Sequence, residues 1–260
     1  CAIDEFDSIR EHDRGAIHEA MEQQTLSVAK AGLVCKLRTK CSVLAACNPK
    51  GPRYDREYGM QVNTGLPSPL LSRFDVVLLL SDEVSSHVNR GAYDETRDRQ
   101  VAEHIIQEAI ADPMATTDAK LWPAEKLRTY LEYVKGAFKP SVSPAAQAVL
   151  VAYYSAQRQA DCRSEGRTTI RLLESTVRLA QAHARLMFQS EVTVRDAVYV
   201  VTLLESSASN SRLLGEISAL GSTFDDDPDG TYLPLRDLIL SKLGVDVEER
   251  GESDTASARA

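Results

Sequence analysis

The chain opens on the segment Ala2-Ile3-Asp4-Glu5-Phe6-Asp7, in which apolar residues lead into two adjacent carboxylates. This pattern predicts the end of a buried strand that delivers Asp4 and Glu5 to a loop. At such a strand end in a phosphate-hydrolysing site, the first carboxylate holds the water shell of Mg²⁺ and the second orients or deprotonates the attacking water. A strand end that runs into a solvated turn has the same pattern, so the other parts of a site must come from the residues downstream.

Strand and helix patterns alternate in the residues that follow. They predict an amphipathic helix over residues 8–24, a β-hairpin over 25–40 with its turn at Lys30-Ala31-Gly32, a buried strand over 42–46, a loop rich in Gly and Pro over 49–69 and an apolar strand over 76–80. Interleaved strands and helices are typical of α/β proteins. We therefore expect an α/β organisation for this part of the chain.

Beyond residue 81 the pattern becomes helical. A periodicity of 3.6 residues predicts helices over residues 99–110, 124–138, 145–159, 169–188 and 193–206. Residues 112–118 indicate a linker, and residues 140–144 indicate a boundary before a small all-helical unit. We divide the chain into residues 1–139, 140–207 and 208–260. The last part holds an acidic loop over 221–230, a short helix over 233–243 and a polar tail from residue 248 that we expect to be disordered.

Charge is distributed unevenly along the chain. The net charge of −8 argues against general binding of polyanions, yet residues 23–54 contain no acidic residue. The same window holds six basic residues: Lys30, Lys36, Arg38, Lys40, Lys50 and Arg53. It fits one phosphate-bearing partner contacted in one place. A solvated hairpin whose lysines protect its edges fits equally well.

The cysteines and the apolar runs exclude several classes of protein. The chain has five cysteines and no C-x-x-C pair, which argues against a zinc ribbon and against a disulfide scaffold. We expect a reducing intracellular compartment, with Cys35, Cys41 and Cys47 buried as small hydrophobic residues. No apolar run approaches the 18 residues of a membrane span, so no membrane partner is expected.

Five segments, taken in chain order, carry a family resemblance. The segments CAIDEFD (residues 1–7), HEAMEQQTLSVAKAG (18–32), LAACNP (44–49), LLSRFD (70–75) and TIR (169–171) resemble the minichromosome maintenance (MCM) family of AAA+ helicases. The resemblance covers about residues 1–207. It implies part of an AAA+ P-loop ATPase core, made of a parallel sheet with helices and a β-hairpin insertion, followed by a small all-α lid domain.

The resemblance implies an ATP site that uses Mg²⁺. Asp4 and Glu5 match the Walker B pair, with Asp4 on the Mg²⁺ side through water and Glu5 as the water-activating carboxylate. Asn48 matches sensor 1, an amide that can hydrogen-bond the attacking water or the γ-phosphate without adding a charge. Without the family, Asn48-Pro49 would indicate a turn.

Three further residues match positions that act across a subunit boundary. Arg73 matches the arginine finger, whose planar guanidinium can bridge developing phosphoryl charge in the neighbouring subunit's site. Arg171 matches the sensor 2 arginine of the lid, and Gln23 stands where the family has another trans-acting polar residue. Without the family, Arg73 is equally well explained as a helix-end arginine paired with Asp75.

Lys30 matches the lysine at the tip of the hairpin that points towards DNA in the channel of a ring helicase. This gives the basic window a partner: the phosphates of a DNA strand, contacted by position rather than by base identity. The resemblance thus implies a nuclear DNA helicase of replication or recombination repair, in a homo- or hetero-hexamer of MCM-type subunits. Residues 32–37 and 213–243 resemble the recombination-linked branch of the family, for which an MCM eight-like paralogue is the expected ring partner.

The sequence departs from the family in parts that it does not contain, among them the family's N-terminal DNA-binding domain and the insert that precedes Walker B. It contains no G-x-x-x-x-G-K-[ST] motif, so the loop and the lysine that cradle phosphates are not among these residues. We expect the chain by itself not to hydrolyse ATP, and we regard it as part of a longer protein. The alternative is a non-catalytic AAA+ remnant, an assembly subunit whose Arg73 and Arg171 still complete a partner's ATP site.

Overall fold

The computed structural model describes residues 1–30, 33–51, 54–55, 58–80, 99, 102–103, 105–106, 109, 122–161, 169–207, 213 and 228–246. The chain divides into two compact units, Cys1–Leu79 with Lys139–Ala260, and Leu80–Phe138. The division at residues 139/140 and 207/208 stays a prediction. The linker over 112–118 and the tail from residue 248 lie outside the described residues.

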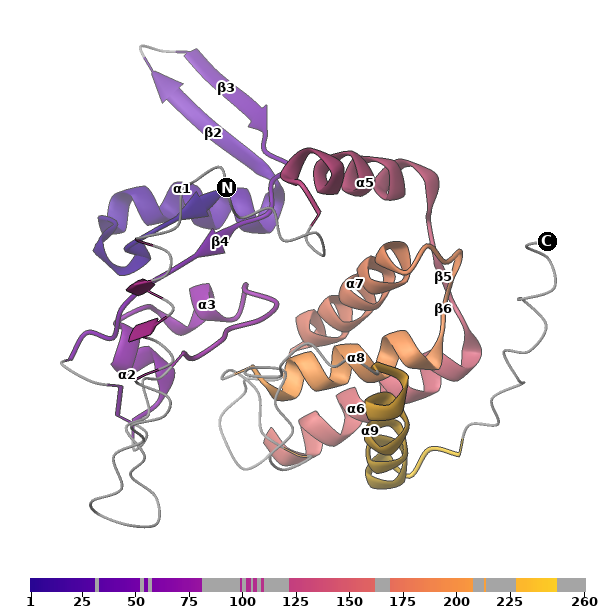
Figure 1. The fold of residues 1–260 in the computed structure, drawn as a ribbon. Helices are drawn as coiled ribbons and strands as arrows, with labels where there is room; N and C mark the ends of the chain where they lie inside the picture. Colours follow the sequence, from indigo (N-terminus) through magenta and orange to yellow (C-terminus); the bar gives the residue numbers. More distant parts are fainter. Residues whose placement is uncertain are drawn as a thin grey trace. The chain divides into compact units, whose positions relative to one another are not determined.

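The N-terminal part of the first unit has the α/β organisation that the sequence predicts (Figure 1). Strand β1 (Ala2–Ile3) pairs in parallel with β4 (Leu44–Ala45). Between them lie a 3₁₀ helix (Phe6–Ser8), helix α1 (Glu11–Gln23) and the antiparallel hairpin of β2 (Thr25–Lys30) and β3 (Leu33–Arg38). The predicted helix, the hairpin and the second strand are therefore confirmed as elements, with the parallel pairing of an AAA+ core. The predicted burial of the two paired strands was wrong, because Ala2 and Leu44 are exposed.

The loop predicted over residues 49–69 was wrong in part, because it contains helix α2 (Met60–Thr64) and the start of α3 (Ser68–Leu71). The cause is Asn63, whose side chain is buried. Its amide donates to the carbonyls of Asp55 and Tyr58 at 2.8 and 3.0 Å, and its oxygen accepts the Asp55 N–H at 2.8 Å. One asparagine therefore satisfies the backbone of a turn that the sequence presents only as Gly- and Pro-rich.

The strand predicted over residues 76–80 is not formed either. No described strand pairs with this segment. Instead, the Val77 N–H donates to the Ser207 hydroxyl at 3.1 Å, and that hydroxyl donates to the Val77 carbonyl at 3.3 Å. A side chain thus replaces the ladder partner that an apolar strand needs.

A small apolar core joins the beginning of the chain to residues 66–74. Phe6, Leu66 and Leu70 are at most 2% exposed. The ring of Phe74 meets Phe6 edge to face, with centroids 5.7 Å apart. This core fixes the segment after β1 against the segment after α3.

The rest of the first unit is helical, as expected for a lid. It comprises α6 (Pro144–Asp161), α7 (Ile170–Leu186), α8 (Val194–Glu205), α9 (Pro228–Leu243) and a small parallel pair of β5 (Ser141–Val142) with β6 (Glu191–Val192). A capping box starts α8, where the Asp196 carboxylate accepts both the N–H and the hydroxyl of Thr193. Its other oxygen lies 2.6 Å from Nδ1 of His183, which ties α8 to α7.

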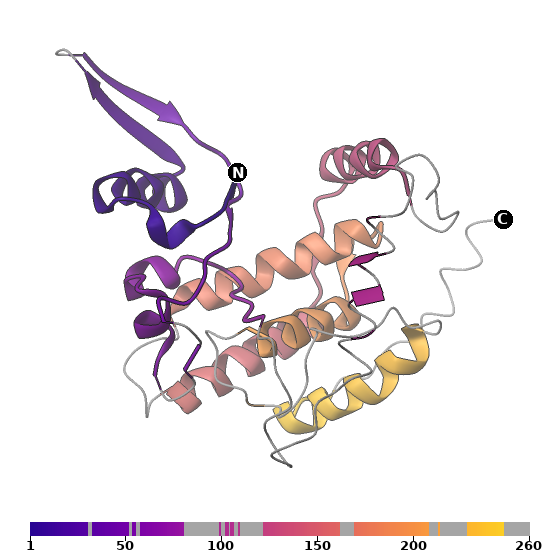
Figure 2. The same cartoon turned by 60° about the vertical axis from the view of Figure 1, so that its left-hand side comes forward.

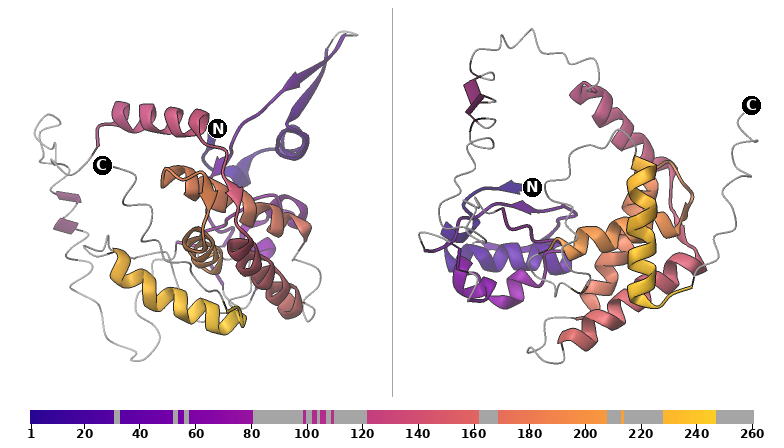
Figure 3. Two further views of the ribbon diagram at one scale, coloured as in Figure 1. Left: turned by 90° about the vertical axis from the view of Figure 1, so that its right-hand side faces the viewer. Right: turned by 60° about the horizontal axis from the view of Figure 1, so that its bottom comes forward.

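Helix α9 lies against α6 and α8 (Figure 2, Figure 3). The helix predicted over 233–243 begins earlier, at Pro228, and continues through Pro234. Proline suits the first helical position, where its missing N–H is not needed. Tyr232 and Ile239 are buried in the same core as α6 and α8, and this burial holds the helix together across Pro234.

The second unit contains α5 (Ala124–Ala137), as predicted over residues 124–138. The described residues between 99 and 109 are helical, as predicted, and the Arg99 guanidinium lies 3.1 Å from the Glu103 carboxylate. Within the described parts of the chain, no helix is both long and apolar enough to cross a bilayer.

The packing of α9 predicts that replacing two neighbouring side chains by alanine lowers the free energy of unfolding by different amounts. Ile239 is 0% exposed and Leu238 is 40% exposed. Ile239→Ala should lower the free energy of unfolding of the 260-residue chain by about 2–5 kcal/mol, and Leu238→Ala by about 0.5 kcal/mol. Urea denaturation followed by circular dichroism measures both. Equal effects would mean that α9 is not part of the lid core.

Candidate nucleotide site

The parallel pairing of β1 with β4 brings three predicted site residues to one edge of the sheet. Asp4 and Glu5 directly follow β1, and Asn48 lies three residues after β4. The Ala46 N–H donates to the Ile3 carbonyl and the Phe6 N–H donates to the Ala46 carbonyl, both at 2.9 Å, so the pairing continues beyond the strands. Carboxyl ends of parallel strands form the edge where α/β proteins bind ligands.

The backbone at Glu5 is left-handed, with φ 49° and ψ 47°. The Glu5 N–H donates to Asp4 Oδ1 at 2.9 Å, and the Ser8 hydroxyl donates to the Glu5 carbonyl at 2.7 Å. Such a conformation costs a non-glycine residue about 1–3 kcal/mol and concentrates at functional sites. The burial of Phe6 directly after Glu5 holds the turn, and both carboxylates remain exposed.

The donor set fits Mg²⁺. This ion keeps several waters and binds through one or two carboxylates together with phosphate oxygens, so a single exposed aspartate at a strand end is sufficient protein ligation. Asp4 would hold that water shell, and Asn48 offers an uncharged donor at the same edge. Among the described residues, no group of three or more His, Cys, Asp or Glu side chains forms a fuller cage.

The burial of three cysteines differs from the sequence prediction. Cys35, Cys41 and Cys47 are exposed rather than buried. Cys35 lies on β3, which pairs only with β2 among the described strands, so the hairpin has no second layer to cover it. The Cys47 residue is exposed as a whole, but its thiol beside Asn48 is partly desolvated. This desolvation and the negative charge of Asp7 raise the pKa of the thiol, which keeps it protonated and weakly nucleophilic near neutral pH.

Arg73 and Arg171 meet at a residue that the sequence analysis did not identify. Both guanidiniums donate to the carboxylate of Glu22 on α1, Arg73 Nη2 at 2.5 Å from Oε2 and Arg171 Nη2 at 2.9 Å from Oε1. A second Arg73 nitrogen donates to the Pro69 carbonyl. Arg73 is therefore paired with Glu22 and not with Asp75. An acid directly before Gln23 was the available signal, but nothing in the sequence placed it near residues 73 and 171.

The pKa of Glu22 is lowered, first by the hydrogen bond and charge of Arg73 and then by Arg171. His18 lies one turn earlier on α1, and burial together with the positive charge of Arg73 lowers its pKa. The carboxylate is therefore ionised and the imidazole neutral near pH 7. Two guanidiniums converge on one anionic group at this place, which is the geometry that also suits a phosphate oxygen.

The same helix holds the hairpin. Glu19, one turn before Glu22, accepts the Ser27 hydroxyl at 2.6 Å and the Ser27 N–H at 3.1 Å, and these hydrogen bonds lower its pKa. Lys30 ends β2 opposite Leu33, so the hairpin carries it to the tip as predicted, although its side chain lies outside the described residues. Gln23 is exposed at the end of α1, directly after Glu22.

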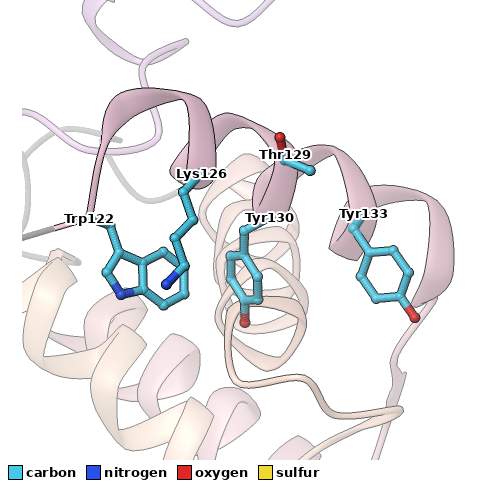
Figure 4. Close-up of a pocket in the computed structure, with 5 residues that line it drawn as sticks. All are labelled: Trp122, Lys126, Thr129, Tyr130 and Tyr133. Carbon is cyan, nitrogen blue, oxygen red and sulfur yellow. The ribbon is translucent and has the colours of Figure 1, made fainter.

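An open hollow on the second unit is separate from these residues (Figure 4). The hollow is lined by one face of α5 and by Trp122, which lies two residues before this helix; the residues from α5 are Lys126, Thr129, Tyr130 and Tyr133. The Lys126 ammonium lies 4.4 Å from the centre of the Trp122 ring, and Trp122 meets Tyr130 edge to face. None of the predicted site residues contributes to it.

Comparison with known proteins assigns the two parts of the chain to one family. Residues 1–109 match the model of the MCM P-loop domain, and residues 125–208 match that of the MCM AAA-lid domain. The second match includes α5 and ends before α9.

Curated relatives agree with the family models. The chain is 47% identical over 232 residues to "Probable DNA helicase MCM9" of Oryza sativa subsp. indica, which covers 88% of this chain and 33% of the relative. It is 46% identical over 239 residues to "Probable DNA helicase MCM9" of Arabidopsis thaliana, covering 91% and 35%. "DNA replication licensing factor Mcm6" of Anopheles gambiae is 39% identical over 213 residues, covering 80% and 24%. The chain thus spans about a third of the length of the first relatives.

The two arginines should affect the Glu22 pKa to different extents. Because Arg73 makes the largest contribution, Arg73→Ala should raise the Glu22 pKa towards its ordinary value of 4.5 further than Arg171→Ala does. The pKa of Glu19, set by Ser27, should stay the same in both variants. A ¹³C NMR titration of the glutamate carboxyls in the 260-residue chain measures the Glu22 and Glu19 pKa values in the parent chain and in both variants.

The sign of the linked stability follows from the lowered pKa. The folded-state value lies below the unfolded-state value, so the contribution is complete above the ordinary pKa and is lost as the pH falls through the lowered one. Arg73→Ala should therefore lose less stability than the parent chain on acidification through this window. A larger pKa shift from Arg171→Ala than from Arg73→Ala would contradict the arrangement.

Proposed function

Because the chain belongs to the minichromosome maintenance family of AAA+ ATPases, we propose that it forms part of the ATP-driven motor of a DNA helicase. The observation that supports this most is the separation of its candidate residues into two groups. Asp4, Glu5 and Asn48 lie at the edge of β1 and β4, whereas Arg73 and Arg171 meet at Glu22. A hexameric ring whose ATP sites lie between subunits needs both groups in every subunit.

In this motor, the first group serves the subunit's own site. Asp4 holds the water shell of Mg²⁺, which neutralises phosphate charge when bound. Glu5 orients or deprotonates the attacking water, and Asn48 donates a hydrogen bond to that water or to the γ-phosphate. The left-handed turn at Glu5 supports this role, because it leaves the Glu5 carboxylate exposed while the next residue, Phe6, is buried.

The second group serves the neighbouring subunit. Arg73 and Arg171 stabilise phosphoryl charge in the neighbour's site, and Gln23 directly follows Glu22 on α1. Their convergence on one carboxylate supports this, because a phosphate of the neighbour can replace Glu22 as the common acceptor. The chain alone, without a phosphate-cradling motif in its sequence, binds ATP weakly and does not turn it over.

The hairpin contacts DNA. Lys30 at its tip, with Lys36 and Arg38 exposed on β3, presents positive charge on a strand pair that is anchored to α1 through Glu19 and Ser27. Such a surface holds phosphates without reading bases.

Within the family, the identities favour one branch. The chain is 46–47% identical to the plant proteins named MCM9 and 39% identical to the mosquito Mcm6. We assign it to the MCM9-like branch, acting in the nucleus in replication or homologous recombination. Its ring partners are other MCM-type subunits, with an MCM eight-like paralogue first among them.

The assignment of the two groups to different subunits predicts complementation. In subunits that also carry the family's P-loop, rings of pure Glu5→Gln and rings of pure Arg73→Ala should both be inactive, since loss of a finger costs about 10³–10⁵ in turnover. Mixing the two should restore DNA-stimulated ATPase, because an interface between an intact Glu5 and an intact Arg73 then exists. The measurement is phosphate release across mixing ratios.

Glu5→Gln mixed with Asp4→Asn is the matched control, because both changes disable a subunit's own site and no interface recovers. Co-assembly is verified by tagging each variant. If co-assembled Glu5→Gln and Arg73→Ala rings recover no activity at any ratio, Arg73 does not serve a neighbour, and the shared-site motor is wrong.

Replacing Lys30 should separate DNA handling from nucleotide binding. Lys30→Ala in the same complete subunit should weaken DNA binding and unwinding alike for all sequences, because it removes a phosphate contact. Nucleotide affinity should be unchanged. Lys135→Ala, at an exposed lysine in the last turn of α5, is the control. Normal unwinding by Lys30→Ala would reduce Lys30 to a lysine that protects the edge of a hairpin.

A further inference from the structure

One face of α7 carries three polar residues at helical spacing: Arg171, Ser175 and Arg178. Arg171 donates to Glu22. Ser175 and Arg178 both contact Asp75, which lies two residues after Arg73. The lid helix that carries one candidate trans arginine therefore also holds the segment that carries the other.

The contact at Asp75 is a small network. Arg178 Nη2 donates to Asp75 Oδ1 at 2.6 Å and to the Ser175 hydroxyl at 3.1 Å, and the Ser175 hydroxyl donates to the same carboxylate oxygen. Ser175 is only 4% exposed, so its position is fixed by packing. The network therefore fixes Asp75 relative to α7.

Other contacts hold the chain on both sides of Asp75. The Arg73 and Phe74 N–H groups donate to carbonyls of α3, and Phe74 packs on Phe6. Val77 is bonded to Ser207, just after α8. Asp75 is the charged link in this segment between the apolar core around Phe6 and the helical lid.

The pair contributes little to stability. The side chains of Asp75 and Arg178 are 43% and 55% exposed, and exposed ion pairs contribute little to folding because solvent screens them. Their geometry is nevertheless specific, since one guanidinium nitrogen serves both Asp75 and Ser175. A contact of this kind has its main effect on position.

We propose that Asp75 and Arg178 are positioning residues for Arg73, and that they keep Arg73 in register with Arg171 so that both guanidiniums reach one neighbouring phosphate group together. The proposal rests on the proposed function, in which Arg73 and Arg171 act in trans. Arg171 lies on α7, and Arg73 is linked to α7 through Asp75. A displacement of α7 therefore moves both arginines together. Without the Asp75 link, Arg73 can move independently of Arg171.

The expected effect lies in the chemical step. A misplacement of about 1 Å can cost about 10²-fold in rate. In rings of the complete subunit, Asp75→Ala and Arg178→Ala should each lower kcat for ATP by about 10- to 100-fold with KM nearly unchanged, because the finger acts on the transition state. The double variant should lose no more than either single variant, since both act through one contact. Arg178→Lys, which keeps a donor for Asp75, should recover part of the activity.

Two readouts and one control variant separate positioning from a structural role. The melting temperature should move little in either single variant. Asp75→Ala should recover ATPase when mixed with Glu5→Gln, as a trans defect does. Asp13→Ala, which removes an exposed carboxylate 2.9 Å from Arg10, is the matched control and should leave kcat unchanged.

Arg73→Ala measured in parallel distinguishes the possible failures. If Arg73→Ala keeps full ATPase, the proposed function fails. If Arg73→Ala is inactive but Asp75→Ala and Arg178→Ala keep wild-type kcat, the positioning role alone is wrong. Additive losses in the double variant, or a large fall in melting temperature, would also overturn it, because the two residues would then act separately or through folding.

Discussion

The burial of Phe6 is the constraint on which the N-terminal part of the molecule depends. Phe6 follows the carboxylates of Asp4 and Glu5 without a spacer, and its ring packs with Leu70 and Phe74 on either side of Arg73 in the sequence. A side chain that is 1% exposed thus ties the acidic end of a parallel strand to the arginine-bearing end of α3. Full burial of an aromatic ring contributes about 1.5–3 kcal/mol, comparable with the backbone cost at Glu5.

Ion pairs made by Glu22 and Asp75 connect further segments of the subunit. Glu22 neutralises two arginines from segments nearly a hundred residues apart, and Asp75 neutralises a third from the lid. Each of these three arginines therefore has a carboxylate as partner. Helix α1 contributes twice, with Glu22 towards the arginines and Glu19 towards the hairpin. The same short helix consequently contacts both the arginines for which we propose a role at the nucleotide and the hairpin for which we propose a role on DNA.

Local patterns predicted most of the elements and few of the contacts. Periodicity located α5, α6, α7 and α8, and alternation located the hairpin, because these signals lie within each segment. The turn around Asn63 and the bonds of Val77 to Ser207 depend on partners distant in sequence or on one buried amide, and both were missed. Asp4, Glu5 and Asn48 could be placed in one site in advance only through the family resemblance, which matches them to parts of one ATP site. The meeting of Arg73 with Glu22 could not.

The left-handed backbone at Glu5 places local stability and chemistry in opposition. Glycine adopts φ near 50° without a steric penalty, so Glu5→Gly would remove the backbone cost of this turn. This gain would offset the larger conformational entropy that glycine loses on folding. Selection for a more robust fold alone would therefore drift away from the carboxylate to which we assign the activation of water. A library screened only for heat resistance should accumulate glycine at this position. Under the proposed function, Glu5 serves turnover at the expense of this turn.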